Sequence, residues 1–293
     1  MEDTNRLVSV VIPTHNRADM LYRAVKSVRD QTHEELEIVL VDDASSDGTP
    51  EMVKGWMRED SRIKYLRNDR PRGASFARNR GIEAASGHWL ALLDDDDEFM
   101  RERIARLLRC FDDENWSFVC SDYLSVKKTG TRLSRKPGII DFRKILWMNY
   151  ATLPLLTHRR KLLDIGGFDE SLSAAQDYDL VVRLIQAHGP AYRLGKALYV
   201  YHQEHESTRI TSSFGKRFRG YWQFYQKFRR YMTRSQRAYH LYRLRKITGK
   251  QFSWSRFFGM VPLRYYPMEL NDFLIERTNF YKILNRLTGL WKR

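Results

Sequence analysis

Short apolar, β-branched runs alternate with helical patterns through the first hundred residues, and this alternation limits the folds open to the chain. Four runs predict buried strands, at residues 8–12, 36–41, 63–66 and 89–93. Apolar residues at helical spacing predict helices between them, at residues 17–30, around 52–56 and at 74–85. Strands that alternate with helices form a parallel sheet. We therefore expect an α/β fold with a mostly parallel central sheet flanked by helices.

Polar residues follow three of these strands where each strand ends. The groups are Thr14 to Arg17, Asp42-Asp43 and Asp94 to Asp97. Because the carboxyl ends of parallel strands share one edge of a sheet, the three groups are expected to converge there. Ligands of such folds bind at this edge, so the convergence predicts a ligand site formed by residues 1–97. Residues 98–212 are expected to complete the sheet, with strands at 118–120 and 197–201 and helices at 145–150 and 178–187.

Four consecutive aspartates, Asp94 to Asp97, follow the fourth predicted strand. While the backbone stays extended, Asp94 and Asp96 point to the same side, and their repulsion favours a cation between them. Mg²⁺ or Mn²⁺ suits such a pair, together with substrate phosphates. A solvated acidic turn is the alternative. The chain has neither a G-x-x-x-x-G-K-[ST] loop nor a G-x-G-x-x-G motif after the first strand, so a bound diphosphate would need a metal or a basic residue such as Arg78.

Charge divides the chain near residue 213. Residues 214–293 hold 19 Lys and Arg against 3 Asp and Glu, whereas the whole chain has a net charge of +15. The same segment holds 20 of the 38 aromatic residues. We therefore expect a near-neutral body, residues 1–212, and a helical, basic and aromatic C-terminal region, residues 213–293.

The first part of the C-terminal region has the pattern of an amphipathic helix. Its two faces would be Phe214, Phe218, Tyr221, Trp222, Tyr225, Phe228 and Met232 on one side, and Lys216, Arg219, Lys227 and Arg230 on the other. Aromatic and basic residues together suit the headgroup layer of an anionic membrane. The alternative is that the aromatic face packs against the body or a second subunit, which leaves a homodimer open.

The N-terminus lacks the apolar core of a signal peptide, and no apolar run approaches the roughly 20 residues that span a bilayer. Cys110 and Cys120 match no zinc spacing and are expected to be buried thiols in a reducing cytosol. The expected location is therefore cytoplasmic and peripheral, on the inner face of the plasma membrane.

Five motifs, in their order and spacing, resemble family 2 of the glycosyltransferases over about residues 7–212. They are Val10 to Arg17, Val41 to Asp47, Gly73 with Ala77 to Gly81, Leu93 to Asp97, and Gly166 to Glu170 followed by Gln176 to Leu180. The resemblance implies a GT-A catalytic domain at residues 1–212, with a nucleotide-sugar-binding half at residues 1–97 and an acceptor half at residues 98–212. It also implies an inverting, metal-dependent enzyme. Such an enzyme would move a hexosyl or N-acetylhexosaminyl group from a nucleotide-diphosphate donor, most simply a UDP-sugar, to a glycan or lipid-linked glycan.

The resemblance also implies roles on the donor side. Pro13 and Thr14 would line the nucleobase pocket, and Asp43 would accept a hydrogen bond from the imide nitrogen of uracil. Arg17, Arg78 and Asp95 would belong to the nucleotide site, with Arg78 beside the diphosphate. Asp94 would lie near the ribose and the metal, and Asp96 would be the direct metal ligand. These implied donor contacts are Pro13, Thr14, Arg17, Asp43, Arg78, Asp94 and Asp95.

On the acceptor side, the resemblance implies that Asp177 is the catalytic base. The residue before it is Gln176, where the family often has Glu. A helix N-cap is the structural alternative for Asp177. A histidine after the last strand is a further metal ligand in some relatives, and the spacing favours His205 over His202.

Two other functions are alternatives. A nucleic-acid-binding protein could use the basic aromatic region, but the four aspartates would repel phosphates without a metal. A nucleotidyltransferase on a related scaffold typically has a glycine-rich loop after the first strand, and Thr14 to Arg17 contains no glycine. Nucleic acid is therefore not the expected partner.

Overall fold

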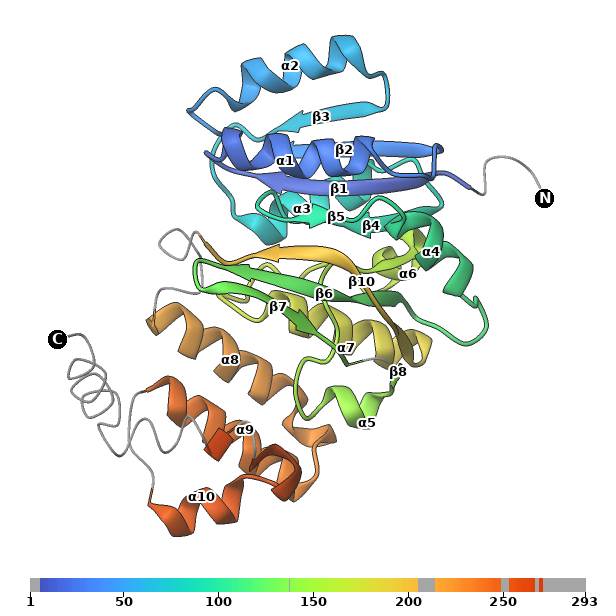
Figure 1. Ribbon diagram of the computed structural model, residues 1–293. Coiled ribbons are helices and arrows are strands. Elements are labelled where there is room, and N and C mark those ends of the chain that lie inside the picture. Colours follow the sequence, from blue (N-terminus) through green and yellow to red (C-terminus); the bar gives the residue numbers. More distant parts are fainter. Residues whose placement is uncertain (1–5, 137, 205–213, 249–252, 267–268, 271–293) are drawn as a thin grey trace, which may run out of the picture. The chain divides into compact units, whose positions relative to one another are not determined.

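The computed structural model describes residues 6–136, 138–204, 214–248, 253–266 and 269–270 (Figure 1). The chain divides into two compact units, Met1–Ser212 and Ser213–Arg293. In the first unit the strands are β1 Val8–Thr14, β2 Leu36–Asp42, β3 Ile63–Arg67, β4 Trp89–Leu92, β5 Glu98–Phe99, β6 Val119–Lys127, β7 Gly130–Ser134, β8 Gly138–Ile140, β9 Leu156–His158 and β10 Ala191–His202. Its helices are α1 Ala18–Arg29, α2 Thr49–Glu59, α3 Ala74–Ala84, α4 Arg103–Cys110, α5 Phe142–Ile145, α6 Arg159–Asp164 and α7 Gln176–His188.

The strands of the first unit form one mixed sheet in the order β3-β2-β1-β4-β9-β6-β10-β5, with β7 added to β6 and β8 to β10. Strands β1 to β4 pair in parallel, as the alternation of strands and helices predicted. Residues 98–212 complete the sheet as expected, with β9 entering it antiparallel between β4 and β6. The helix expected at 145–150 is wrong, since α5 ends at Ile145 and the chain turns after it.

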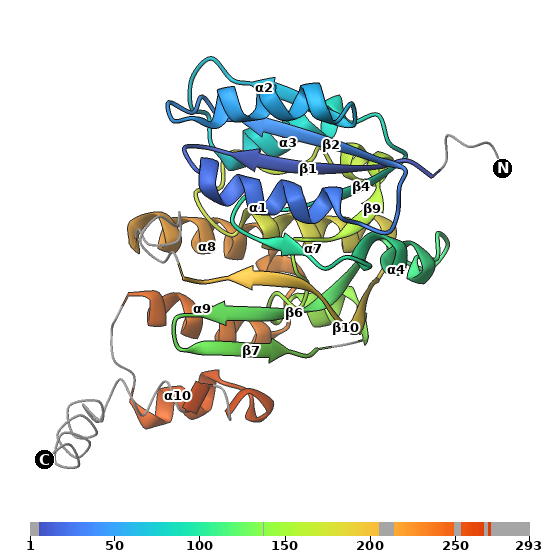
Figure 2. The ribbon, with the colours of Figure 1, turned by 45° about the horizontal axis from the view of Figure 1, so that its top comes forward.

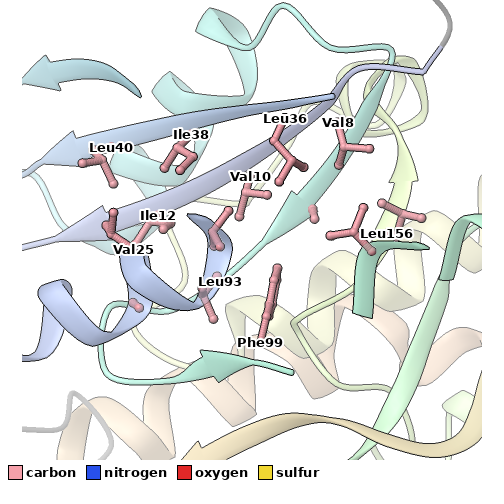
Figure 3. Close-up of a cluster of buried hydrophobic side chains, with 14 of the residues drawn as sticks. Val8, Val10, Ile12, Val25, Leu36, Ile38, Leu40, Leu93, Phe99 and Leu156 are labelled. Carbon is pink, nitrogen blue, oxygen red and sulfur yellow. The ribbon is translucent and has the colours of Figure 1, made fainter. Parts of the chain in front are cut away.

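Helices α1 and α3 lie on opposite faces of β1 (Figure 2), and all residues of this strand are buried. Val10 and Ile12 pack with Val25 of α1 in the main core cluster (Figure 3). Val11 faces α3 instead, where a Cβ on Gly81 would come within 2.4 Å of a Val11 methyl carbon. The close approach of α3 to the sheet therefore requires glycine at position 81.

The two cysteines differ in environment. Cys120 is buried in β6, as expected, but Cys110 at the end of α4 is half-exposed. The expectation of two buried thiols is therefore wrong for Cys110, because the last turn of α4 leaves the core that Ile104 and Leu107 enter.

The second unit is helical in the part that the structure describes. It contains α8 Phe214–Phe228, η4 Arg229–Tyr231, α9 Arg234–Ile247, α10 Trp254–Met260 and η5 Leu263–Tyr265. A capping box between Thr233 and Gln236 begins α9. Tyr239 of α9 stacks on Tyr265 at 4.7 Å between ring centroids, so aromatic side chains join the helices.

The aromatic face predicted for residues 214–232 is divided in the structure. Its C-terminal part is buried, and the rings of Tyr225 and the neighbouring Phe224 lie against His240 of α9. Phe214 and Trp222 are exposed. The prediction of one continuous aromatic face is therefore wrong, because part of that face packs within the second unit. Within the described residues, no helix combines the length and apolarity that crossing a membrane demands.

Candidate active site

Three strand ends meet at one edge of the sheet, where β1 lies between β2 and β4. The Asp43 amide donates to the Thr14 carbonyl at 2.8 Å, which joins the ends of β2 and β1. The Arg17 guanidinium donates to Asp95 at 2.9 Å, which joins the ends of β1 and β4. Pro13 and Thr14 are buried at the end of β1. The polar groups that follow these strands in the sequence thus form a single cluster.

The residues Asp94–Asp97, called here the acidic turn, do not continue β4. The strand ends at Leu92, and the Asp97 amide donates back to the Asp94 carbonyl at 3.2 Å. The extended backbone assumed for Asp94 and Asp96 is therefore wrong. The turn nevertheless brings one carboxylate oxygen each of Asp94, Asp96 and Asp97 within 4.8 Å of one another.

Positive side chains offset part of this charge. Arg17 lies 3.4 Å from a carboxylate oxygen of Asp96, in addition to its bond with Asp95. Burial raises the pKa of Asp95 to about 6 against the attraction of Arg17. Burial and the neighbouring carboxylates raise the pKa of Asp97 to about 8. Clustered carboxylates with raised pKa values are stabilised by a hard divalent cation, and oxygen ligands are those it prefers, so the donor set fits Mg²⁺ or Mn²⁺.

Arg78 of α3 reaches the acidic turn from the side and donates to Asp94 at 2.5 Å. Its guanidinium lies 5.3 Å from the ring centroid of Phe168. Phe168 is held in turn by Asn79, whose side chain accepts from the Phe168 amide at 2.7 Å and donates to its carbonyl at 2.9 Å. Gly167 has a φ of 63°, and a Cβ there would lie 2.4 Å from the Asn79 oxygen. Glycine is therefore required where this segment supports Arg78.

Asp43 lies at the other side of the cluster and is buried. Its carboxylate accepts from the Asn68 amide group at 2.7 Å and from the backbone N–H groups of Arg72 and Gly73 at 2.8 and 2.7 Å. The carboxylate thus holds the loop at residues 68–73 against the end of β2. A nucleobase that donated to Asp43 would share or replace these bonds.

Asp177 is the second residue of α7, not its N-cap, because the helix begins at Gln176 and Ala175 is the cap. Desolvation raises the pKa of Asp177, with opposing effects from the Tyr178 amide and from Arg78 and a smaller increase from Asp94. The charges of the acidic turn and its arginine therefore reach this carboxylate. Asn149 donates to it at 3.3 Å. Gln176 turns away and donates to the Leu172 carbonyl at 3.0 Å.

The histidine expected to bind metal, His205, lies outside the described residues. His202, the alternative to His205 in the sequence, contacts the acidic turn and Glu98 instead. Its backbone N–H donates to Asp97 at 2.9 Å, and its ring Nε2 lies 2.6 Å from a Glu98 oxygen.

Three non-glycine residues with positive φ surround the cluster. Asn16, Ala44 and Ala175 have φ values of 53°, 62° and 62°. They follow β1, follow β2 and precede α7, so each one turns the chain next to a residue of the site. Left-handed backbone is costly for side chains with a Cβ, and it gathers at functional sites.

Four polar residues of the site gave no recognisable signal in the sequence. Asn68 holds Asp43, Asn149 holds Asp177, Arg23 donates to the Asp96 carbonyl at 2.8 Å, and Tyr199 donates to Asp97. Each lies 25 or more residues from its partner, so no local motif could indicate the contact.

Comparison with known proteins indicates the family to which the sequence is similar. The family model described as Glycosyl transferase family 2 matches residues 9–168. WcaA of Escherichia coli K12, assigned as a glycosyl transferase of colanic acid biosynthesis, is 30% identical over 269 residues, which cover 89% of this chain and 95% of WcaA.

Solved structures are similar in fold at 20% sequence identity. Staphylococcus aureus TarS 1–349 in complex with UDP-GlcNAc has a TM-score of 0.61, and the match covers 92% of this chain and 81% of TarS 1–349. The mannosyltransferase PcManGT of Pyrobaculum calidifontis, in complex with GDP-Man and Mn²⁺, has a TM-score of 0.56, with 88% and 69% of the two chains covered.

Proposed function

Because the chain belongs to glycosyl transferase family 2 and has the GT-A fold, we propose that the acidic turn and Asp177 form the active site of an inverting, metal-assisted glycosyltransferase. Transfer of a sugar from a nucleotide-sugar donor is the activity of the family. One observation carries the proposal: the acidic turn brings carboxylate oxygens of Asp94, Asp96 and Asp97 within 4.8 Å of one another, and Arg78 donates to Asp94 at 2.5 Å. Asp177 would be the base of the same site, because Arg78 and Asp94 both affect its pKa.

On the donor side, Asp94 and Asp96 would hold Mg²⁺ or Mn²⁺ in the acidic turn. A divalent cation there supplies positive charge for the leaving diphosphate. Arg78 adds a fixed positive charge beside Asp94, while Arg17 offsets the charge of Asp95 and Asp96. Side chains that are already held in place cost little reorganisation when the charge of the leaving group develops.

On the acceptor side, Asp177 would accept the proton of the attacking hydroxyl. Its raised pKa makes the carboxylate a stronger base than an exposed aspartate, and Asn149 fixes one of its oxygens. The bond from the hydroxyl oxygen to the anomeric carbon forms as the bond to the diphosphate breaks. A single displacement of this kind inverts the configuration of the sugar.

We expect the nucleotide selectivity to depend on the carboxylate of Asp43, which would lie in the nucleobase pocket with Pro13 and Thr14. The Asp43 carboxylate already accepts hydrogen bonds from the Asn68 side chain and from two backbone N–H groups. The imide N–H of uracil is a donor of the same kind. UDP-sugars are therefore expected to be the preferred donors, with dTDP-sugars as the competitor because thymine has the same edge. TarS 1–349 is a neighbour bound to UDP-GlcNAc, and PcManGT is one bound to GDP-Man.

A donor screen with Mn²⁺ and an extract-derived glycan acceptor tests this selectivity. Nucleoside diphosphate release is measured with UDP-, GDP-, dTDP- and CDP-sugars, and the highest kcat/KM is expected for a UDP-sugar. Binding of UDP and GDP by calorimetry provides the control that needs no acceptor. Tighter binding of GDP than of UDP would contradict the role of Asp43.

The second unit suggests where the acceptor is found. Among its described residues the acidic side chain is Glu269, which is buried and bonded to Tyr239 and Lys246. The described surface of this unit therefore carries positive charge without an exposed carboxylate. Large apolar side chains are exposed beside basic ones, notably Phe258 and Leu263 near Arg256 and Arg264 on α10 and η5. We therefore assign this surface to anionic lipid on the inner face of the plasma membrane, where a lipid-linked glycan acceptor would be presented.

Co-sedimentation with vesicles tests this assignment. Intact protein is expected to sediment with phosphatidylglycerol vesicles at low salt and to remain in solution with phosphatidylcholine. Each surface cation contributes about 1 kcal/mol near anionic lipid, so the variant Arg256→Gln with Arg264→Gln should partition about 30-fold less. The matched control is Arg132→Gln with Arg135→Gln, two exposed arginines of the first unit. Intact protein that ignores anionic vesicles would contradict the assignment and favour a soluble acceptor.

A further inference from the structure

Asp97 is the fourth carboxylate of the acidic turn, and its surroundings differ from those of Asp94 and Asp96. It is fully buried, and both of its oxygens are hydrogen-bonded to β10. Oδ2 accepts from the Tyr199 hydroxyl, and Oδ1 accepts from the His202 amide at 2.9 Å. Asp94, by contrast, is partly exposed. Asp97 therefore anchors the acidic turn to β10.

The same strand also holds the residues that follow the turn. Glu98 and Phe99 form β5, which pairs antiparallel with Val200 and Tyr199 of β10. The ring Nε2 of His202 lies 2.6 Å from Glu98. The acidic turn is therefore held at both ends. Strand β4 precedes it, and β5, which follows it, is paired with β10.

A buried arginine, Arg103, contacts the ring of Tyr199, which donates to Asp97. Arg103 is fully buried, and it donates to the Ser121 hydroxyl at 2.6 Å and to the Pro154 carbonyl. Its guanidinium lies 5.7 Å from the ring centroid of Tyr199 and 4.7 Å from that of Phe99. A cation over the ring holds Tyr199 in the position from which its hydroxyl reaches Asp97.

We propose that Asp97 and Tyr199 position the acidic turn for a divalent cation whose protein ligands are Asp94 and Asp96, an inference that rests on the proposed function. Three carboxylates within 4.8 Å repel one another, and the turn needs an external hold to keep them converged. The Tyr199 hydroxyl and the His202 amide supply that hold through Asp97. Asp97 and Tyr199 are thus positioning residues of the metal site, and partners of this kind orient the ligands that touch a metal.

Metal affinity is the readout that separates positioning from ligation. Full-length protein is titrated with Mn²⁺ in the presence of UDP, and free Mn²⁺ is followed by electron paramagnetic resonance. Tyr199→Phe removes one hydroxyl and is expected to weaken Mn²⁺ binding about 10- to 100-fold. UDP binding without metal should stay unchanged, since the bonds of Asp43 are not altered. The matched control is Tyr123→Phe, because the Tyr123 ring contacts Tyr199 edge-on at 6.1 Å and no bond joins its hydroxyl to the acidic turn within the described residues.

Asp97→Asn completes the test and carries it alone should Tyr199→Phe fail to fold. An anchor should lose Mn²⁺ affinity in Asp97→Asn as well, because asparagine offers one acceptor oxygen where the carboxylate offers one to Tyr199 and one to the His202 amide. The losses in Asp97→Asn and Tyr199→Phe should not add in the double variant, because both changes act on the same pair of side chains. A metal ligand would behave differently: Asp97→Asn would match Asp96→Asn, and Tyr199→Phe would match Tyr123→Phe. That result would overturn the inference while leaving the proposed function intact. Wild-type protein that binds no Mn²⁺ with UDP would overturn both.

Discussion

Asp177→Asn is expected to lower kcat about 100- to 10,000-fold, the range over which a positioned general base accelerates proton transfer. Asparagine keeps the shape of the side chain but cannot take the proton of the acceptor hydroxyl. The affinity for UDP should stay within a factor of two or so, because the base acts on the acceptor and not on the donor. Steady-state kinetics with saturating donor and calorimetry with UDP measure the two quantities.

The control for this variant is Asp19→Asn, which removes an exposed carboxylate from the first turn of α1 in the same way that Asp177→Asn removes one from α7. It should keep full activity. Equal losses in both variants would show that helix stability, not proton transfer, is affected. Product analysis by NMR gives a second check, since single displacement inverts the anomeric configuration. A retained configuration would refute the mechanism.

The pH dependence of the wild-type enzyme should reflect the same carboxylate. Asp177 must be deprotonated to act, and desolvation raises its pKa above that of an ordinary aspartate. Activity is therefore lost as the pH falls through the raised pKa, at a higher pH than for an exposed carboxylate. The acid limb of kcat/KM measures this value, and the residual activity of Asp177→Asn should not show the limb.

Asp96→Asn, or removal of divalent cations, is expected to lower activity by about 1,000-fold, because metal stabilisation of a leaving diphosphate is worth several kcal/mol. The fold should survive, since Arg23 holds the Asp96 carbonyl and the His202 amide of β10 holds the Asp97 side chain, and neither bond involves the Asp96 carboxylate. Chelator titration of the wild type, followed by restoration with Mn²⁺ or Mg²⁺, is the direct measurement. Thermal unfolding of the variant tests whether the fold is intact.

Asp30→Asn serves as the control for charge loss, because Asp30 is exposed and bonded to Lys26 at the end of α1. Its activity and its response to chelator should equal those of the wild type. Full turnover in excess chelator would exclude a metal-assisted mechanism. A loss of activity in Asp96→Asn that added metal fully restores would instead indicate weakened binding.

Local sequence determined the first half of the sheet and the edge at which the site forms. The β-branched run at Val8–Ile12 cannot be amphipathic, because both faces of β1 are covered, by α1 through Val10 and by α3 through Val11. The same reasoning holds for β2 and β4. Polar residues directly after such strands must lie at one edge when the strands are parallel, so the positions of Asp43 and the acidic turn were predictable from order alone.

Contacts across the fold decided the rest, because they depend on how distant strands pair. The sequence placed Asp94 and Asp96 on an extended strand, whereas the structure turns the chain there and ties Asp97 to Tyr199, which lies 102 residues away. The antiparallel entry of β9 and the position of β5 on β10 bring these residues together. No local pattern records such pairings, since their free energy arises from burial and hydrogen bonds formed only when the whole sheet is assembled. The residue types of the candidate site could therefore be predicted from the sequence. The side chains that hold those residues in place were decided by the tertiary structure.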